Sequence, residues 1–129
     1  MVRRIYAINC EMVYNKVSRV SIVDEKFKCV LDTNNVPGHA VLSCFFKNFI
    51  IKEDVLVGFN VQKDLQALGF YHSNIKDMAT HPALLESGEI ESLKNLAFQE
   101  LGLHIIEGDK YNSLYYAKAA MDIYKKYSF

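Results

Sequence analysis

Tryptophan is absent from the sequence, and proline and glycine are scarce, with two and six residues among 129. This composition excludes a collagen-like chain, and because half of the residues are hydrophobic and 23% are charged it also argues against disorder. The formal net charge is zero as well, since fifteen Lys and Arg residues balance fifteen Asp and Glu residues. Without a bulk positive field, any contact with nucleic acid must be local. The length fits one globular domain, which we expect to span residues 1–129.

Cysteine usage and the lack of long hydrophobic runs bear on the compartment. The three cysteines, Cys10, Cys29 and Cys44, are odd in number and lack the spacing of a metal site. The first residues lack the apolar run of a signal peptide, and no apolar stretch approaches the roughly 20 residues of a membrane span. We therefore expect a soluble, intracellular protein of the nucleus, nucleolus or cytoplasm, with no membrane partner.

The start of the sequence predicts a mostly buried strand that carries two polar residues. Residues 4–13 are rich in apolar and β-favouring side chains. On a strand, Asn9 and Glu11 lie two positions apart and project from the same face, while Cys10 points the other way. One face of this strand is therefore expected to present an amide and a carboxylate side by side.

The rest of the chain predicts strands followed by alternating strands and helices. Such an order is typical of an α/β domain with a mixed sheet. The apolar run 40–51 fits a strand or a helix equally well and stays unassigned. The other predicted strands are a hairpin of 17–24 and 27–32 with its turn at 24–26, and strands at 54–58 and 74–77, with a loop at 34–39. The predicted helices are one carrying Val61, Leu65 and Leu68, one from the N-cap Ser92 to Gly102, and a last one from Asn112 or Ser113 with the stripe Leu114, Ala117, Met121 and Tyr124.

Six short segments follow one another in an order that matches a known family. They are residues 8–13, 18–24, 55–65, 75–77, 92–97 and 113–124. Together they resemble the DEDD-type 3′-5′ exonucleases, and the nearest branch is the RNA exonucleases and interferon-stimulated exonucleases, whose first motif reads Asp-Cys-Glu-Met-Val. The resemblance covers nearly the whole chain. It implies a ribonuclease H-like fold, a mixed β-sheet flanked by helices, here in a shortened form.

The resemblance also implies a two-metal phosphodiester hydrolase. In such a family four carboxylates bind two Mg²⁺ or Mn²⁺ ions, and a histidine near the last carboxylate activates the attacking water. Hard divalent cations prefer oxygen ligands, and two of them about 3.5–4 Å apart repel each other unless several negative charges surround them. The number of carboxylates at the matching positions is therefore the test of activity.

At the positions that match the family's catalytic residues, Glu11 and Asp64 keep their carboxylates, whereas three residues depart from the pattern. Asn9 stands where the first aspartate is expected, and an amide carries no formal charge. Tyr111 stands in place of the histidine, and a phenol with a pKa of about 10 is a poor base at neutral pH. Tyr116 stands in place of the last carboxylate. These losses favour a pseudoenzyme, with Glu11 and Asp64 as the residual metal ligands if any metal binds.

Three functional hypotheses follow. The favoured one is a degenerate, inactive exonuclease-like domain that binds RNA or another single-stranded nucleic acid, or that acts as a scaffold in an RNA-processing complex, and needs no cofactor. The second is an active 3′-5′ exoribonuclease with a reduced site, in which Glu11 and Asp64 hold Mg²⁺ or Mn²⁺. The third is a protein-interaction module, such as a homodimer, which the neutral charge supports because dedicated RNA binders are usually basic.

The tyrosines of the last segment have two interpretations. Tyr111, Tyr115 and Tyr116 are placed to stack on nucleic-acid bases, an interaction worth roughly 1–3 kcal/mol per base. Alternatively, their rings pack between a helix and the sheet and their hydroxyls form hydrogen bonds. Because consecutive residues project about 100° apart on a helix, Tyr115 and Tyr116 are expected to face different surroundings.

Overall fold

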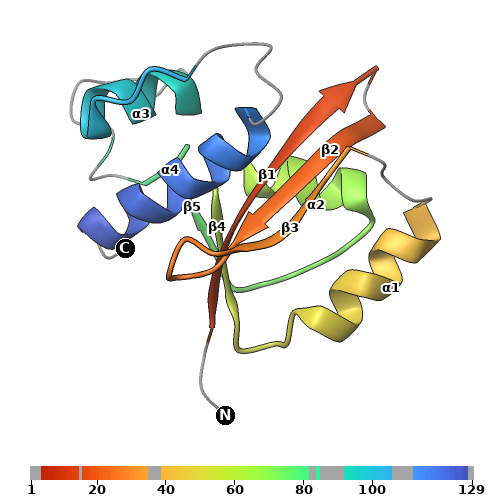
Figure 1. Cartoon of the computed structure of the whole chain (residues 1–129). Coiled ribbons are helices and arrows are strands. Elements are labelled where there is room, and N and C mark those ends of the chain that lie inside the picture. Colours follow the sequence, from red (N-terminus) through yellow and green to blue (C-terminus); the bar gives the residue numbers. More distant parts are fainter. Residues whose placement is uncertain are drawn as a thin grey trace.

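The described strands form a five-stranded mixed sheet in the order β3-β2-β1-β4-β5 (Figure 1). The computed structural model describes residues 4–14, 16–34, 39–81, 84, 92–105 and 112–127. The strands are β1 (Ile5–Val13), β2 (Lys16–Val23), β3 (Cys29–Thr33), β4 (Val55–Gly58) and β5 (Ile75–Asp77). β2 pairs antiparallel with both β1 and β3, whereas β4 runs parallel to β1 and β5. The predicted hairpin, the three antiparallel strands and the mixed sheet are confirmed.

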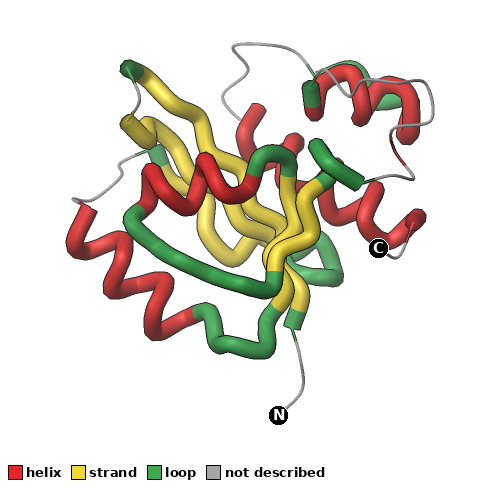
Figure 2. The backbone as a smooth tube through the Cα atoms, turned by 180° about the vertical axis from the view of Figure 1, so that it is seen from behind, coloured by secondary structure: helices red, strands yellow, loops and turns green. Residues whose placement is uncertain are grey.

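Helices cover both faces of this sheet (Figures 1 and 2). α1 (His39–Phe49) and α2 (Val61–Leu68) pack on one face, while α4 (Asn112–Tyr127) packs on the other, with α3 (Leu93–Leu101) against α4. Because side chains alternate along a strand, β1 contributes to both cores: Ala7 packs in the cluster that includes α4, and Ile8 in the cluster that includes α1 and α2. None of the helices in the described ranges is both long and apolar enough to cross a membrane.

The segment 40–51, which the sequence left open, forms most of α1. Phe46 of this helix is fully buried, and its ring packs against Phe70 at 5.5 Å between centroids. An apolar run of this length has the periodicity of either element, so tertiary packing decides between them. The prediction of a loop is wrong for His39, where α1 begins, and residues 35–38 of the predicted loop lie outside the described part of the chain.

The predicted boundaries of α3 are confirmed in detail. The Ser92 hydroxyl accepts a hydrogen bond from the Asn95 backbone N–H at 3.1 Å, which caps the first turn. Gly102 ends the helix in the left-handed conformation, with φ of 68°.

The buried face of α4 is wider than the predicted stripe. Ala117 and Met121 are buried as expected, whereas Leu114 and Tyr124 are half-buried against the same core. Residues on a second side of the helix are also buried, because α4 lies between the sheet and α3; they include Ala119 and Ile123.

Candidate functional site

Asn9 and Glu11 lie on β1, and Asn9 faces the first turn of α4. The Asn9 amide Nδ2 donates a hydrogen bond to the Ser113 hydroxyl at 3.2 Å, and the oxygen of that hydroxyl lies 3.3 Å from the Asn9 backbone carbonyl oxygen. Ser113 is fully buried. The amide at the position of the first expected carboxylate is therefore committed to holding β1 against α4.

A row of polar side chains continues from Asn9 across the sheet. Asn9 on β1 pairs with Ser21 on β2, and Ser21 pairs with Asp32 on β3. Because paired residues of neighbouring strands project from the same face, these side chains lie in contact. The Ser21 hydroxyl donates to Asp32 Oδ1 at 2.7 Å and lies 2.9 Å from the Ser113 hydroxyl oxygen. The row therefore links three strands to α4 through hydrogen bonds.

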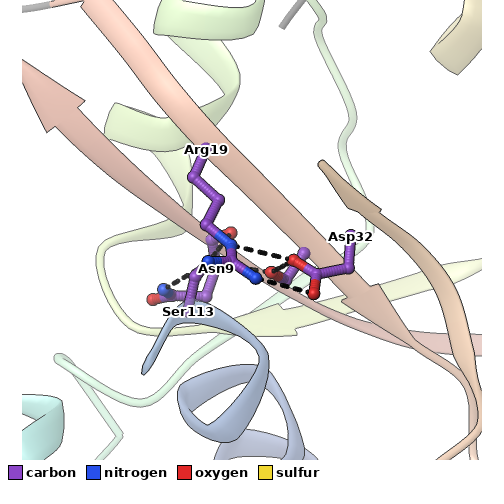
Figure 3. Close-up of polar contacts among 5 residues, drawn as sticks. Asn9, Arg19, Asp32 and Ser113 are labelled. Carbon is purple, nitrogen blue, oxygen red and sulfur yellow. Dashed lines mark hydrogen bonds and ion pairs between the residues drawn. The ribbon is translucent and has the colours of Figure 1, made fainter. Parts of the chain in front are cut away.

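Arg19 binds Asp32, the last residue of this row. Its guanidinium donates two hydrogen bonds to Asp32, from Nε to Oδ1 at 3.0 Å and from a terminal nitrogen to Oδ2 at 2.8 Å (Figure 3). Burial acts to raise the pKa of Asp32, but the hydrogen bonds from Arg19 and Ser21 outweigh it and the pKa is lowered. Asp32 is therefore held as a carboxylate beside a cation.

Glu11 lies directly opposite Arg19 in the pairing of β1 with β2. A half-buried carboxylate and a guanidinium thus share the face of the sheet that also carries Asn9. Arg19, Ser21, Asp32 and Ser113 were not among the site residues predicted from the sequence. Arg19 and Ser21 could have been predicted, because they lie two positions apart on β2 and therefore share one face. Pairing in the hairpin then brings them opposite Glu11 and Asn9.

Asp64 reaches β1 from α2. β4 pairs with β1 only as far as Ala7, so the next part of β1 is open to α2, and Asp64 accepts a hydrogen bond from the backbone of Cys10. Only 8% of Asp64 is exposed, and this burial raises its pKa to about 7, against the lowering effects of the Cys10 hydrogen bond and of Lys63. α2 therefore places the Asp64 carboxyl group beside the backbone of Cys10 in β1.

Asp77, at the end of β5, holds the start of α2 in place. Its carboxylate accepts hydrogen bonds from the backbone N–H groups of Asn60 at 2.8 Å, Val61 at 3.0 Å and Ala79 at 3.0 Å. A carboxylate at a helix N-terminus satisfies otherwise unpaired N–H groups and interacts favourably with the helix dipole. Asp77 therefore orients the helix from which Asp64 projects.

Tyr116, at the position of the last expected carboxylate, is half-buried among apolar side chains between α3 and α4. Its neighbours in this cluster are Ala97, Ile105 and Ala119. Tyr115, one position earlier, is 42% exposed, so the two rings do face different surroundings. Tyr111 lies outside the described residues. Tyr116 also packs against the apolar cluster that joins α4 to the sheet.

The carboxylates in this region do not fit a pair of divalent cations. Within the described ranges, no group of three or more His, Cys, Asp or Glu side chains is arranged to hold a metal ion. Glu11 and Asp64 are the carboxylates at matching family positions, whereas Asn9 is neutral and hydrogen-bonded to Ser113. Two negative charges poorly offset the repulsion between two adjacent divalent cations.

Comparison with curated proteins finds exonuclease relatives, although no family model matches the chain. The exonuclease GOR of Pan troglodytes is 28% identical over 92% of this chain. RNA exonuclease 4 of Mycosarcoma maydis is 40% identical over 59% of this chain. The chain spans only 22% of the length of each of these relatives.

Comparison with solved structures finds the same fold in RNA exonuclease modules. The Saccharomyces cerevisiae Pan2 pseudoubiquitin hydrolase–RNA exonuclease module, in complex with AAUUAA RNA, matches 97% of this chain and 28% of its own, with a TM-score of 0.75 and 19% identity. The Neurospora crassa Pan2 catalytic unit matches 99% of this chain and 28% of its own, with a TM-score of 0.73 and 15% identity. The expected fold class is thereby confirmed. The sequence similarity to exonucleases and the fold shared with RNA exonuclease modules support the expected relationship of this chain to the DEDD-type exonucleases.

Proposed function

We propose that this domain binds single-stranded RNA on an exonuclease fold without hydrolysing it. One observation carries the proposal: at the matching positions in the described part of the chain, two carboxylates, Glu11 and Asp64, remain of the four that the family uses. Asn9 and Tyr116 occupy the other two positions.

The surroundings of these two replacements support a structural role for both. The Asn9 amide donates to Ser113 and so contributes to a buried hydrogen-bond network that joins β1 to α4. The Tyr116 ring packs between α3 and α4. Buried polar groups are costly to leave without partners, and rings that fill a helix interface stabilise it, so both side chains stabilise the fold as they stand.

RNA is the ligand class that the relatives suggest. One sequence relative is named an RNA exonuclease, and one structural neighbour is an exonuclease module in complex with RNA. Because the net charge is zero, we expect moderate affinity, with few phosphate contacts and a shallow dependence on salt.

A paired assay of cleavage and binding tests the proposal. The protein is incubated with 5′-labelled single-stranded RNA in Mg²⁺ or Mn²⁺, beside a matched Glu11→Gln/Asp64→Asn variant that reports contaminating nuclease. We expect equal background cleavage by both proteins, while fluorescence anisotropy shows that the wild type binds the RNA. Multiple turnovers by the wild type that disappear in the double variant would overturn the proposal and establish the reduced-site enzyme. Failure of the wild type to bind any single strand would leave the scaffold or the protein-interaction module.

Adding one carboxylate provides a second test. Asn9→Asp is nearly isosteric and gives the site three acids, so Mn²⁺ at millimolar concentration should raise the Tm of this variant. The wild type should show a smaller rise, since it has two acids. Equal rises in Tm for the two proteins would contradict the view that the site has lost its capacity for metal.

A further inference from the structure

The tip of the β1–β2 hairpin carries an aromatic side chain that packs against almost nothing. Tyr14 is 95% exposed, and Val13 before it is 52% exposed. Figures 1 and 2 show this end of the hairpin extending beyond the helices that cover the sheet. Burial in the core therefore does not explain the tyrosine.

The backbone at this position also disfavours tyrosine. Val13, the last residue of β1, pairs with Lys16, the first residue of β2, and Tyr14 lies in the turn that follows Val13. Tyr14 has a φ of 51°, in the left-handed region where glycine and asparagine are preferred in such turns. The chain thus holds a bulky side chain in an unfavourable conformation at an exposed point, and strained residues of this kind cluster at functional sites.

A β-bulge connects the hairpin tip to the candidate site. The pairing of β1 with β2 shifts between Glu11 and Met12, and the Ser18 hydroxyl donates to the Glu11 backbone carbonyl at 3.1 Å within this irregularity. Bulges increase the twist of a strand and redirect its end, and they occur often beside active sites. Tyr14 follows Glu11 by three residues, at most about 10 Å along a strand, which matches about three stacked nucleotides.

We propose that Tyr14 is a base-stacking residue, which packs its ring on an unpaired base of the single-stranded RNA bound near Glu11. This inference rests on the proposed function and assigns it a contact outside the family's catalytic positions. Stacking on an aromatic ring tolerates any base, and it requires a base that is not already enclosed in a duplex. The exposed Lys16 beside the loop supplies a cation for a neighbouring phosphate.

The absence of tryptophan allows a direct test of contact. Tyr14→Trp introduces a single indole fluorophore into the chain. Tyr71→Trp is the matched control, because Tyr71 is also exposed, at 79%. Its neighbour His72 contacts the backbone of Asp54 at the amino end of β4. That end of β4 pairs with the start of β1, whereas Tyr14 follows the other end of β1. Single-stranded RNA should quench the fluorescence of the Tyr14→Trp variant, with a midpoint equal to the Kd from anisotropy, and should leave that of the Tyr71→Trp variant unchanged. Equal quenching of both variants, or of neither while RNA is bound, would overturn the inference.

Affinity and stability of further variants separate a contact from a structural role. Tyr14→Ala and Tyr14→Gly should each weaken RNA binding by about 5- to 150-fold, whereas Tyr14→Phe and Tyr71→Ala should bind as the wild type does. Glycine suits a positive φ, so Tyr14→Gly should lose affinity without a fall in Tm. If the wild type binds RNA and Tyr14→Gly binds it equally well, the inference fails and the proposed function stands. If the wild type binds no RNA, the proposed function fails and the inference with it.

Discussion

Replacing Asp64 by asparagine should stabilise the protein at alkaline pH. Asp64 is 8% exposed, and burial raises its pKa from 3.8 to about 7. The folded protein therefore keeps this proton up to about pH 7, whereas the unfolded chain loses it above about pH 4. Between these two values the native state binds one proton more than the unfolded state, so the free energy of unfolding falls as the pH rises. This loss is complete above about pH 7.

The size of the effect follows from the difference in pKa. Each pKa unit corresponds to about 1.4 kcal/mol, so a difference of about three units amounts to about 4 kcal/mol at most. Asparagine has nearly the same shape, keeps a carbonyl oxygen as acceptor for the hydrogen bond from the Cys10 backbone and carries no charge to desolvate. For a chain of this length about 1 kcal/mol shifts the Tm by about 4 °C, so the gain at pH 8 is readily measured.

Thermal unfolding followed by circular dichroism at pH 5, 7 and 8 measures this effect. The wild type should lose stability from pH 5 to pH 8, and Asp64→Asn should lose much less. Glu25→Gln, at an exposed carboxylate in the β2–β3 turn, is the matched control and should follow the wild type. If Asp64→Asn melts below the wild type at pH 8, or if its pH dependence equals that of the wild type, the buried carboxyl is not the cause.

Two further substitutions test the packing that positions the site. Gly58→Ala should destabilise the fold by about 1–3 kcal/mol, because a Cβ there would lie 2.8 Å from the Ile8 carbonyl oxygen and 3.0 Å from Val61 Cγ2. Denaturant unfolding measures this loss of stability, and an unchanged midpoint would show that β1 and β4 separate easily. Asp77→Ala removes the acceptor of three backbone hydrogen bonds, so it should lower the free energy of unfolding by about 1–3 kcal/mol. It should also speed hydrogen exchange at the Val61 amide, with the β2 amides as the internal reference. Unchanged exchange at Val61 would exclude the capping role of Asp77.

Much of the secondary structure could be predicted from the sequence because its causes are local. Alternation of side chains along residues 4–13 places Asn9 and Glu11 on one face, whatever the rest of the fold does. Ser92 and Gly102 act through hydrogen bonds and backbone angles within a few residues of themselves, so their roles at the ends of α3 were predictable.

The environment of the candidate site was decided by tertiary structure alone. The hydrogen bond between Asn9 and Ser113 joins residues 104 positions apart, and no local pattern indicates it. The raised pKa of Asp64 depends on how deeply α2 lies against β1, and the left-handed conformation of Tyr14 depends on the pairing of Val13 with Lys16. Propensity and alternation are properties of neighbours along the chain, whereas burial, charge state and strain are set by the groups that folding brings together from distant segments.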